Sequence, residues 1–79
     1  MDREQIKKRF FEALELHGYN TEGMTEDSSF VDDFAFDSLD VIECLIYTEE
    51  EFDISISDEE IDKVVKVKDV IDLIENKLS

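Results

Sequence analysis

The 79-residue sequence contains no proline, and its only glycines are Gly18 and Gly23. Small domains built from strands need many tight turns, and most such turns require glycine or proline. The sequence therefore predicts helices joined by polar loops rather than a sheet. Its length predicts a single domain over residues 1–79.

Four segments have apolar residues at the i, i+3, i+4 spacing of an amphipathic helix. The segments are 3–17, 38–53, 57–65 and 68–77. The third is short and begins with a capping box formed by Ser57 and Glu60, whereas the fourth has no side chain suited to cap its start. The predicted fold is an all-α four-helix bundle with a long first loop and a short third helix.

The long first loop, residues 19–37, is polar and acidic but contains Phe30, Phe34 and Phe36. A connection of this length in a small domain is usually functional or attached to the core. We expect the aromatic side chains to pin this loop to the core.

The second predicted helix has an apolar side and a mixed side when its residues are placed at 100° intervals. The predicted core-facing residues are Val41, Leu45, Thr48 and Phe52, with Ile42 flanking them. The residues predicted to point away from the core are Asp40, Tyr47 and Glu51. Between these two sides runs a mixed strip of Leu39, Glu43, Ile46 and Glu50. Periodicity alone leaves open whether this mixed strip is a docking surface or a wider core face.

Lysine and arginine occur only near the two ends of the chain. Between Phe10 and Asp62 there is none, while aspartate and glutamate occur eighteen times, and the net charge is −15. Such a surface repels nucleic acid and anionic membranes and attracts basic protein surfaces. A purely solubilising acidic surface is the alternative that the charge leaves open.

The sequence indicates a cytoplasmic protein, which we expect to be a monomer. Residues 1–4 begin no apolar stretch typical of a signal peptide, and no apolar run approaches the roughly 18 residues of a membrane span. The single cysteine, Cys44, has no partner for an internal disulfide, which fits a reducing compartment. We therefore expect no insertion into membranes.

No catalytic or metal-binding pattern is evident, so neither an enzyme nor a metal site is expected. His17 is the only histidine, and we interpret it as a capping-region residue of the first helix, with Gly18 at the terminating position. Residues 33–44 lack the central glycine and terminal glutamate of a calcium-binding loop. Cys44 is interpreted as a small, semi-buried residue.

Asp37-Ser38-Leu39 is the one candidate for covalent chemistry. Ser38 is predicted in the first turn of the second helix, near free backbone amides and the positive end of the helix dipole, with Asp37 placed to cap that helix. A phosphodiester formed there is electrostatically favoured. Taken alone, the tripeptide also fits an ordinary serine at a helix start.

The surroundings of this tripeptide resemble the acyl carrier protein family over about residues 28–78. The motifs that carry the resemblance are Phe30-Val31-Asp32-Asp33, Asp37-Ser38-Leu39-Asp40, Glu49-Glu50-Glu51-Phe52-Asp53, Ile56 and Asp58-Glu59-Glu60. The resemblance implies that Ser38, flanked by Asp37 and Leu39, receives 4′-phosphopantetheine from coenzyme A through a phosphopantetheinyl transferase. The thiol of that arm, not Cys44, would then hold acyl groups as thioesters for fatty-acid, polyketide or related biosynthetic enzymes.

The resemblance also implies a docking face for partner enzymes with basic patches. The acidic positions that match are Asp37, Asp40, Glu43, Glu49 and Glu50, and the apolar ones are Leu39 and Ile46. This implication favours the docking interpretation of the mixed strip.

The sequence departs from the family pattern just before Ser38 and on the core stripe. Phe34-Ala35-Phe36 stands where the family usually has Leu-Gly-x, so we expect a restricted backbone at Ala35 and extra bulk from Phe36 beside the arm. Thr48 stands at a usual leucine position, and its hydroxyl is expected to bond the carbonyl four residues back. These departures indicate a specialised carrier as an alternative to one for general fatty-acid synthesis.

Two other functions remain open at this point. One is a peptidyl or aminoacyl carrier, and the other is an acidic interaction protein without a cofactor. Ser38 separates the second from any carrier, because only a carrier requires its hydroxyl.

Overall fold

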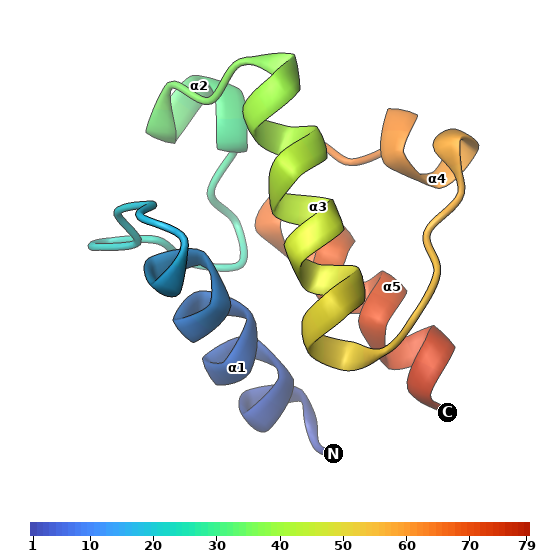
Figure 1. Cartoon of the computed structure of the whole chain (residues 1–79). Helices are drawn as coiled ribbons and strands as arrows, with labels where there is room; N and C mark the ends of the chain where they lie inside the picture. Colours follow the sequence, from blue (N-terminus) through green and yellow to red (C-terminus); the bar gives the residue numbers. More distant parts are fainter.

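The computed structural model describes all 79 residues and consists of helices and loops. The helices are α1 (Arg3–Leu16), α2 (Phe30–Phe34), α3 (Ser38–Phe52), α4 (Asp58–Asp62) and α5 (Val67–Leu78). The long helix α3 runs through the middle of the molecule with α1 beside it and α5 behind it, and both termini lie at the end opposite α2 (Figure 1). The predicted all-α bundle is confirmed, with α4 as its short helix. None of the five helices combines the length and the apolar character that crossing a bilayer requires.

Side-chain caps define where most of the helices begin. Asp2, Asp37 and Ser57 each accept a hydrogen bond from the backbone amide three residues ahead, at the starts of α1, α3 and α4. The predicted caps at Asp37 and Ser57 are thus confirmed. At the start of α5, Lys66 provides no side-chain cap, as predicted, and instead the carboxylate of Asp69 accepts from the Lys66 amide at 2.8 Å.

One apolar core joins the three long helices. The buried apolar residues of these helices are Ile6, Phe10, Ala13 and Leu14 of α1, Cys44, Leu45 and Phe52 of α3, and Val67, Val70, Ile71 and Ile74 of α5. Fully burying one large apolar side chain of this kind stabilises a fold by about 1.5–3 kcal/mol. The hydroxyl of buried Thr48 donates to the Cys44 carbonyl at 2.8 Å, which confirms the predicted bond.

Two expectations about burial on α3 need correction, one for Cys44 and one for Val41 of the predicted core stripe. Cys44, expected to be semi-buried, is completely enclosed, whereas Val41 is only half-buried. Two of the residues predicted to point away from the core, Tyr47 and Glu51, are also placed differently. Tyr47 stacks on His17 with ring centroids 3.6 Å apart, and Glu51 accepts hydrogen bonds from Arg9. That side of α3 faces α1, because α3 is central and contacts neighbours on more than one side.

The long first loop contains an extra helical turn, α2, which is not among the helices predicted from the sequence. Ser29 caps this turn by accepting from the Asp32 amide at 3.1 Å. Phe30 is buried and Phe34 half-buried, so the expectation that aromatic residues pin the loop is confirmed. The loop is also tied to the segment before α5, because the Phe30 amide donates to Val65 and the Val67 amide donates to Ser28.

Phe36 also lies inside this aromatic cluster. Its ring is buried, 5.6 Å from the ring of Phe30 and 5.1 Å from that of Tyr19. The expectation that Phe36 adds bulk beside a group on Ser38 is therefore wrong. An apolar ring that can reach the core is more stable there than in water.

Candidate functional site

Ser38 is the first residue of α3 and is exposed to solvent. The amides of Asp37 and Asp40 are both occupied, because each donates to the carboxylate of the other residue, at 3.1 and 2.8 Å. The amides of Ser38 and Leu39 donate to no acceptor within the protein. The positive end of α3 is therefore open next to the Ser38 hydroxyl, an arrangement that favours a phosphate group.

The turn that precedes Ser38 contains a non-glycine residue in the left-handed region of backbone conformation. Ala35 ends α2 with φ of 57°. Its amide donates to Val31 and the Phe36 amide donates to Phe30, which closes the end of α2. A β-carbon in this conformation costs roughly 1–2 kcal/mol. The backbone thus adopts the conformation that glycine tolerates best, although alanine occupies the position.

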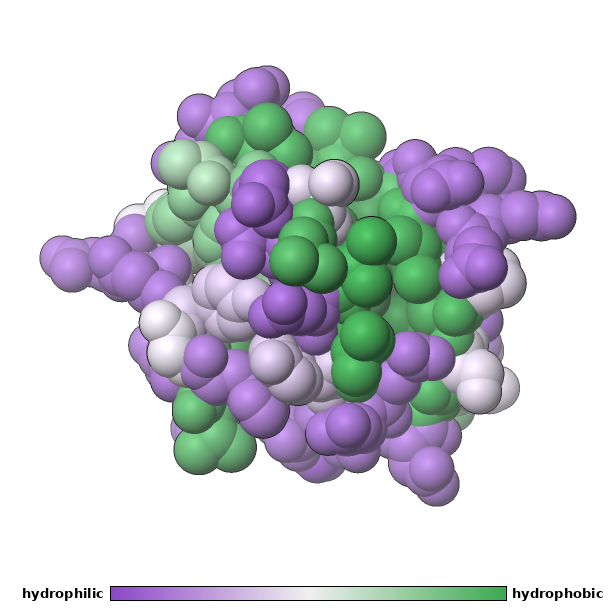
Figure 2. Space-filling view, turned by 45° about the horizontal axis from the view of Figure 1, so that its top comes forward, coloured by the Kyte–Doolittle hydropathy of each residue, from purple (hydrophilic) through white to green (hydrophobic).

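A groove of about 240 Å³ opens beside Ser38 among α2, α3 and α4. Its apolar lining consists of Val31, Val41, Ile42, Ile61 and Val64, and Ser38 and Asp62 also line it. Figure 2, in which α2 and the start of α3 are turned toward the viewer, shows apolar surface bordered by hydrophilic side chains on this face. An apolar chain attached to Ser38 would find a surface of matching polarity within reach.

The mixed strip of α3 is largely on the surface. Leu39 and Ile46 are 60 % and 43 % exposed, and Glu50 is exposed as well. Glu43 is half-buried, and its carboxylate accepts a hydrogen bond from the Tyr19 hydroxyl at 3.2 Å. The strip is therefore not an extension of the core.

The remaining acidic candidates each have a local structural contact. Asp37 and Asp40 cap α3, and Glu49 accepts from the Ile56 amide at 2.9 Å, which holds the loop after α3. No pattern in the sequence indicates this bond of Glu49. None of the five acidic candidates forms an ion pair within the molecule.

Cys44 and His17 are in structural positions. Burial, together with the nearby charges of Asp40 and Glu43, raises the pKa of the Cys44 thiol to about 12, so it stays protonated near neutral pH. His17 is the C-cap residue of α1, as interpreted from the sequence, and its amide donates to the Ala13 and Leu14 carbonyls. Neither residue is arranged as a nucleophile or a base.

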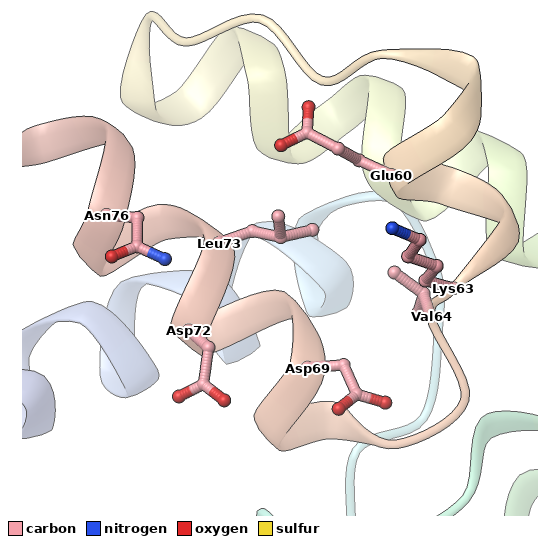
Figure 3. Close-up of a pocket in the computed structure, with 7 residues that line it drawn as sticks. All are labelled: Glu60, Lys63, Val64, Asp69, Asp72, Leu73 and Asn76. Carbon is pink, nitrogen blue, oxygen red and sulfur yellow. The ribbon is translucent and has the colours of Figure 1, made fainter.

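A second groove, of about 310 Å³, lies between α4 and α5, and most of its lining residues are polar or charged. Figure 3 shows its lining side chains projecting from α4 (Glu60), from the residues just after α4 (Lys63 and Val64) and from α5, for example Asp72. Its lining includes none of the residues predicted for the site, and it shares only Val64 with the groove beside Ser38.

Comparison with known proteins identifies the family. Residues 4–74 match the family model PP-binding, described as a phosphopantetheine attachment site. The chain is 49 % identical over 74 residues to an acyl carrier protein of Buchnera aphidicola subsp. Acyrthosiphon pisum (strain 5A), covering 94 % of this chain and 89 % of that one. The chain belongs to the acyl carrier protein family. It is also 40 % identical over 74 residues to an acyl carrier protein of Nitratidesulfovibrio vulgaris (strain DP4), covering 94 % of this chain and 93 % of the relative.

The fold agrees with this assignment. The crystal structure of an acyl carrier protein from Thermotoga maritima matches with a TM-score of 0.85 and 42 % identity, over 99 % of this chain and 92 % of that one. Membership confirms the predicted family, the non-catalytic carrier function and the phosphopantetheine attachment site. An acidic protein without a cofactor is thereby excluded. Acyl carrier proteins interact with a phosphopantetheinyl transferase and with enzymes that act on acyl groups.

Proposed function

We propose that Ser38 is the residue that receives 4′-phosphopantetheine, and that the thiol of this arm carries acyl groups as thioesters. The observation that carries the proposal is the exposed Ser38 hydroxyl beside two unoccupied amides at the start of α3. A phosphodiester on Ser38 would accept from those amides and interact favourably with the helix dipole. Asp37 and Leu39 flank the attachment point, one as the cap and the other as an exposed apolar contact.

The groove beside Ser38 is evidence that the group carried on the arm is apolar. Its lining is mostly aliphatic, and Ser38 itself is one of its lining residues. Transfer of apolar surface out of water is worth about 25 cal/mol per Å². An acyl chain lying along Val41 and Ile42 would therefore be more stable than one extended into solvent.

The mixed strip, with neighbouring Asp40 and Glu49, is proposed as the docking face for enzymes of fatty-acid, polyketide or related biosynthesis. Its acidic residues have no basic partner within the molecule, and Leu39 and Ile46 provide apolar contact area. A partner with a basic patch around an apolar pocket complements both features. The same partners include the phosphopantetheinyl transferase that loads Ser38.

We also propose that the protein is a single-domain monomer located in the cytoplasm. One core joins all three long helices, which supports one domain over residues 1–79. The net charge of −15 opposes association of two copies. Cys44 is free and buried, which fits a reducing compartment.

Loading of Ser38 tests the proposal directly. Incubation with a phosphopantetheinyl transferase, coenzyme A and Mg²⁺ should raise the intact mass by one phosphopantetheine, and Ser38→Ala should abolish the gain. Ser55→Ala is the matched control, because Ser55 is also exposed but lies in the loop after α3. Loading of the Ser38→Ala variant, or no loading of the wild type by several transferases, would contradict the assignment.

A further inference from the structure

The hydroxyl of Tyr19 makes a contact with the proposed docking face that the sequence did not reveal. Tyr19 follows α1 in the first loop, 24 positions before Glu43, yet its hydroxyl donates to Glu43 Oε2 at 3.2 Å. Glu43 is the half-buried acid of the mixed strip, between exposed Leu39 and Ile46. Tyr19 thus connects the first loop to the middle of the strip.

Tyr19 is held firmly from three directions. Its amide donates to the Leu14 carbonyl at 3.0 Å, after the chain has turned at Gly18 with φ of 90°. Its ring lies 5.1 Å from the ring of Phe36 and 6.5 Å from that of Tyr47. A donor supported by rigid elements can orient its acceptor in a defined direction.

Without this hydroxyl, electrostatic repulsion would favour a different position of the Glu43 carboxylate. Asp40 lies one helical turn earlier, and like charges at this spacing repel. Asp40 cannot relax easily, because its carboxylate accepts from the Asp37 amide. Burial and the neighbouring acidic side chains raise the pKa of Tyr19, so the hydroxyl remains a donor throughout the physiological range. The hydrogen bond therefore offsets the repulsion at Glu43.

We propose that Tyr19 is a positioning residue for docking: its hydroxyl holds Glu43 Oε2, so that the carboxylate is already oriented when a basic side chain of the partner enzyme arrives. The inference rests on the proposed docking role of the mixed strip. Ordering a glutamate side chain in advance removes an entropic penalty from binding. The second carboxylate oxygen, Oε1, remains free to accept from the partner's lysine or arginine.

The test is the KM and kcat of transferase loading for four proteins besides the wild type. These are Tyr19→Phe, Glu43→Ala, the double variant and Tyr47→Phe. Tyr19→Phe keeps the ring packing and removes only the hydroxyl, and it should raise KM about three- to tenfold with kcat unchanged. In the double variant, Tyr19→Phe should raise KM no further than Glu43→Ala does alone. Tyr47→Phe is the matched control, because the Tyr47 hydroxyl makes no hydrogen bond within the protein, and it should leave KM unchanged.

The outcomes separate this inference from the proposal on which it rests. If Glu43→Ala raises KM and Tyr19→Phe does not, docking at Glu43 stands and the role of Tyr19 is overturned. An equal rise from Tyr19→Phe in both backgrounds also overturns it, because the hydroxyl would then act through another group. If Glu43→Ala leaves KM unchanged, the docking role of Glu43 fails and the inference fails with it. Circular dichroism of each variant verifies that the helices are retained.

Discussion

Acidic side chains lie in two different environments, one where α1 meets its neighbours and one on the exposed side of α3. In the first, Arg3 binds Glu26 of the first loop and both Asp72 and Glu75 of α5, and Arg9 binds Glu51. In the second, the acids of the mixed strip have no basic partner within the molecule. Both environments belong to the same strongly acidic chain.

This difference shows that the position of an acidic side chain in the fold decides whether it forms an ion pair. Arg3, Lys7 and Arg9 of α1 each form an ion pair that joins α1 to another helix or to the first loop, so those pairs contribute to the fold. The unpaired acids of the mixed strip, Glu43 and Glu50, lie among other acidic side chains that repel them, and no ion pair at these positions offsets this repulsion. A surface that retains this repulsion is suited to a partner that supplies the missing positive charge.

The largest effect on stability is expected from removing Arg3. Arg3→Met leaves three carboxylates without their shared partner and should lower the free energy of unfolding by about 1–2 kcal/mol. Urea denaturation measures the change. Lys8→Met is the control, because Lys8 is exposed and forms no ion pair, and it should have almost no effect. Equal losses from the two variants would mean that total charge, not pairing, matters.

Acid titration of the same variant sharpens this prediction. The hydrogen bond from Arg3 lowers the pKa of Glu26. A carboxylate with a lowered pKa contributes stability above its unfolded value of about 4.3 and loses it as the pH falls through the folded pKa. The stability gap between wild type and Arg3→Met should therefore narrow as the pH is reduced below about 4. A gap independent of pH would show that Arg3 acts through packing alone.

A smaller effect on stability, in the stabilising direction, is expected from Ala35→Gly. Glycine removes the strain of the left-handed conformation but increases the freedom of the unfolded chain, so the net gain should be about 0.5–1 kcal/mol. The change alters no ion pair, so it separates backbone strain before Ser38 from charge. Ala13→Gly inside α1 is the contrasting control and should destabilise by about 1 kcal/mol or more. A loss of stability in Ala35→Gly would contradict the strain at this turn.

The smallest effect on stability is expected from added salt. Sodium chloride or millimolar Mg²⁺ should raise the melting temperature near neutral pH by about 2–4 °C, because screening weakens repulsion among unpaired acids. No group of three or more ligating side chains is placed to hold a metal ion, so screening should dominate the response. Glu50→Gln should reduce the salt response, whereas Arg3→Met should increase it. A melting temperature indifferent to both salts would show that these charges are fully solvated.

Local patterns predicted most of the helices, because helical spacing and capping depend on short-range chemistry. Ser38 was assigned as the attachment residue only because its surroundings resemble the acyl carrier protein family. Asp37 caps α3 and Thr48 bonds the carbonyl of Cys44, each within a few residues along the chain. The one-turn helix α2 was missed, because five residues are too few to show a helical period. Its end at Ala35 was suspected only through the missing glycine.

Contacts between distant parts of the chain were the least predictable. Helical spacing divides α3 into sides but does not tell which neighbour covers each side, so the packing of Tyr47 against His17 was not foreseen. The bond between Tyr19 and Glu43 joins a loop to a helix and leaves no periodic signal. Phe36 illustrates the same limit, because its burial depends on the aromatic neighbours that the folded loop brings to it.

The most direct measurement of the central claim is the association rate of a carrier-binding enzyme with Glu50→Lys and Glu12→Lys variants. Both glutamates are exposed and without an ion pair, but Glu50 is on the mixed strip and Glu12 is on α1. The two variants have the same net charge, so only the position of the change differs. Stopped-flow mixing at low salt should show association slowed about three- to tenfold by Glu50→Lys and little by Glu12→Lys, with the difference shrinking as salt is added. Equal slowing, or none in either variant while both remain folded, would contradict the assignment of the mixed strip as the docking face.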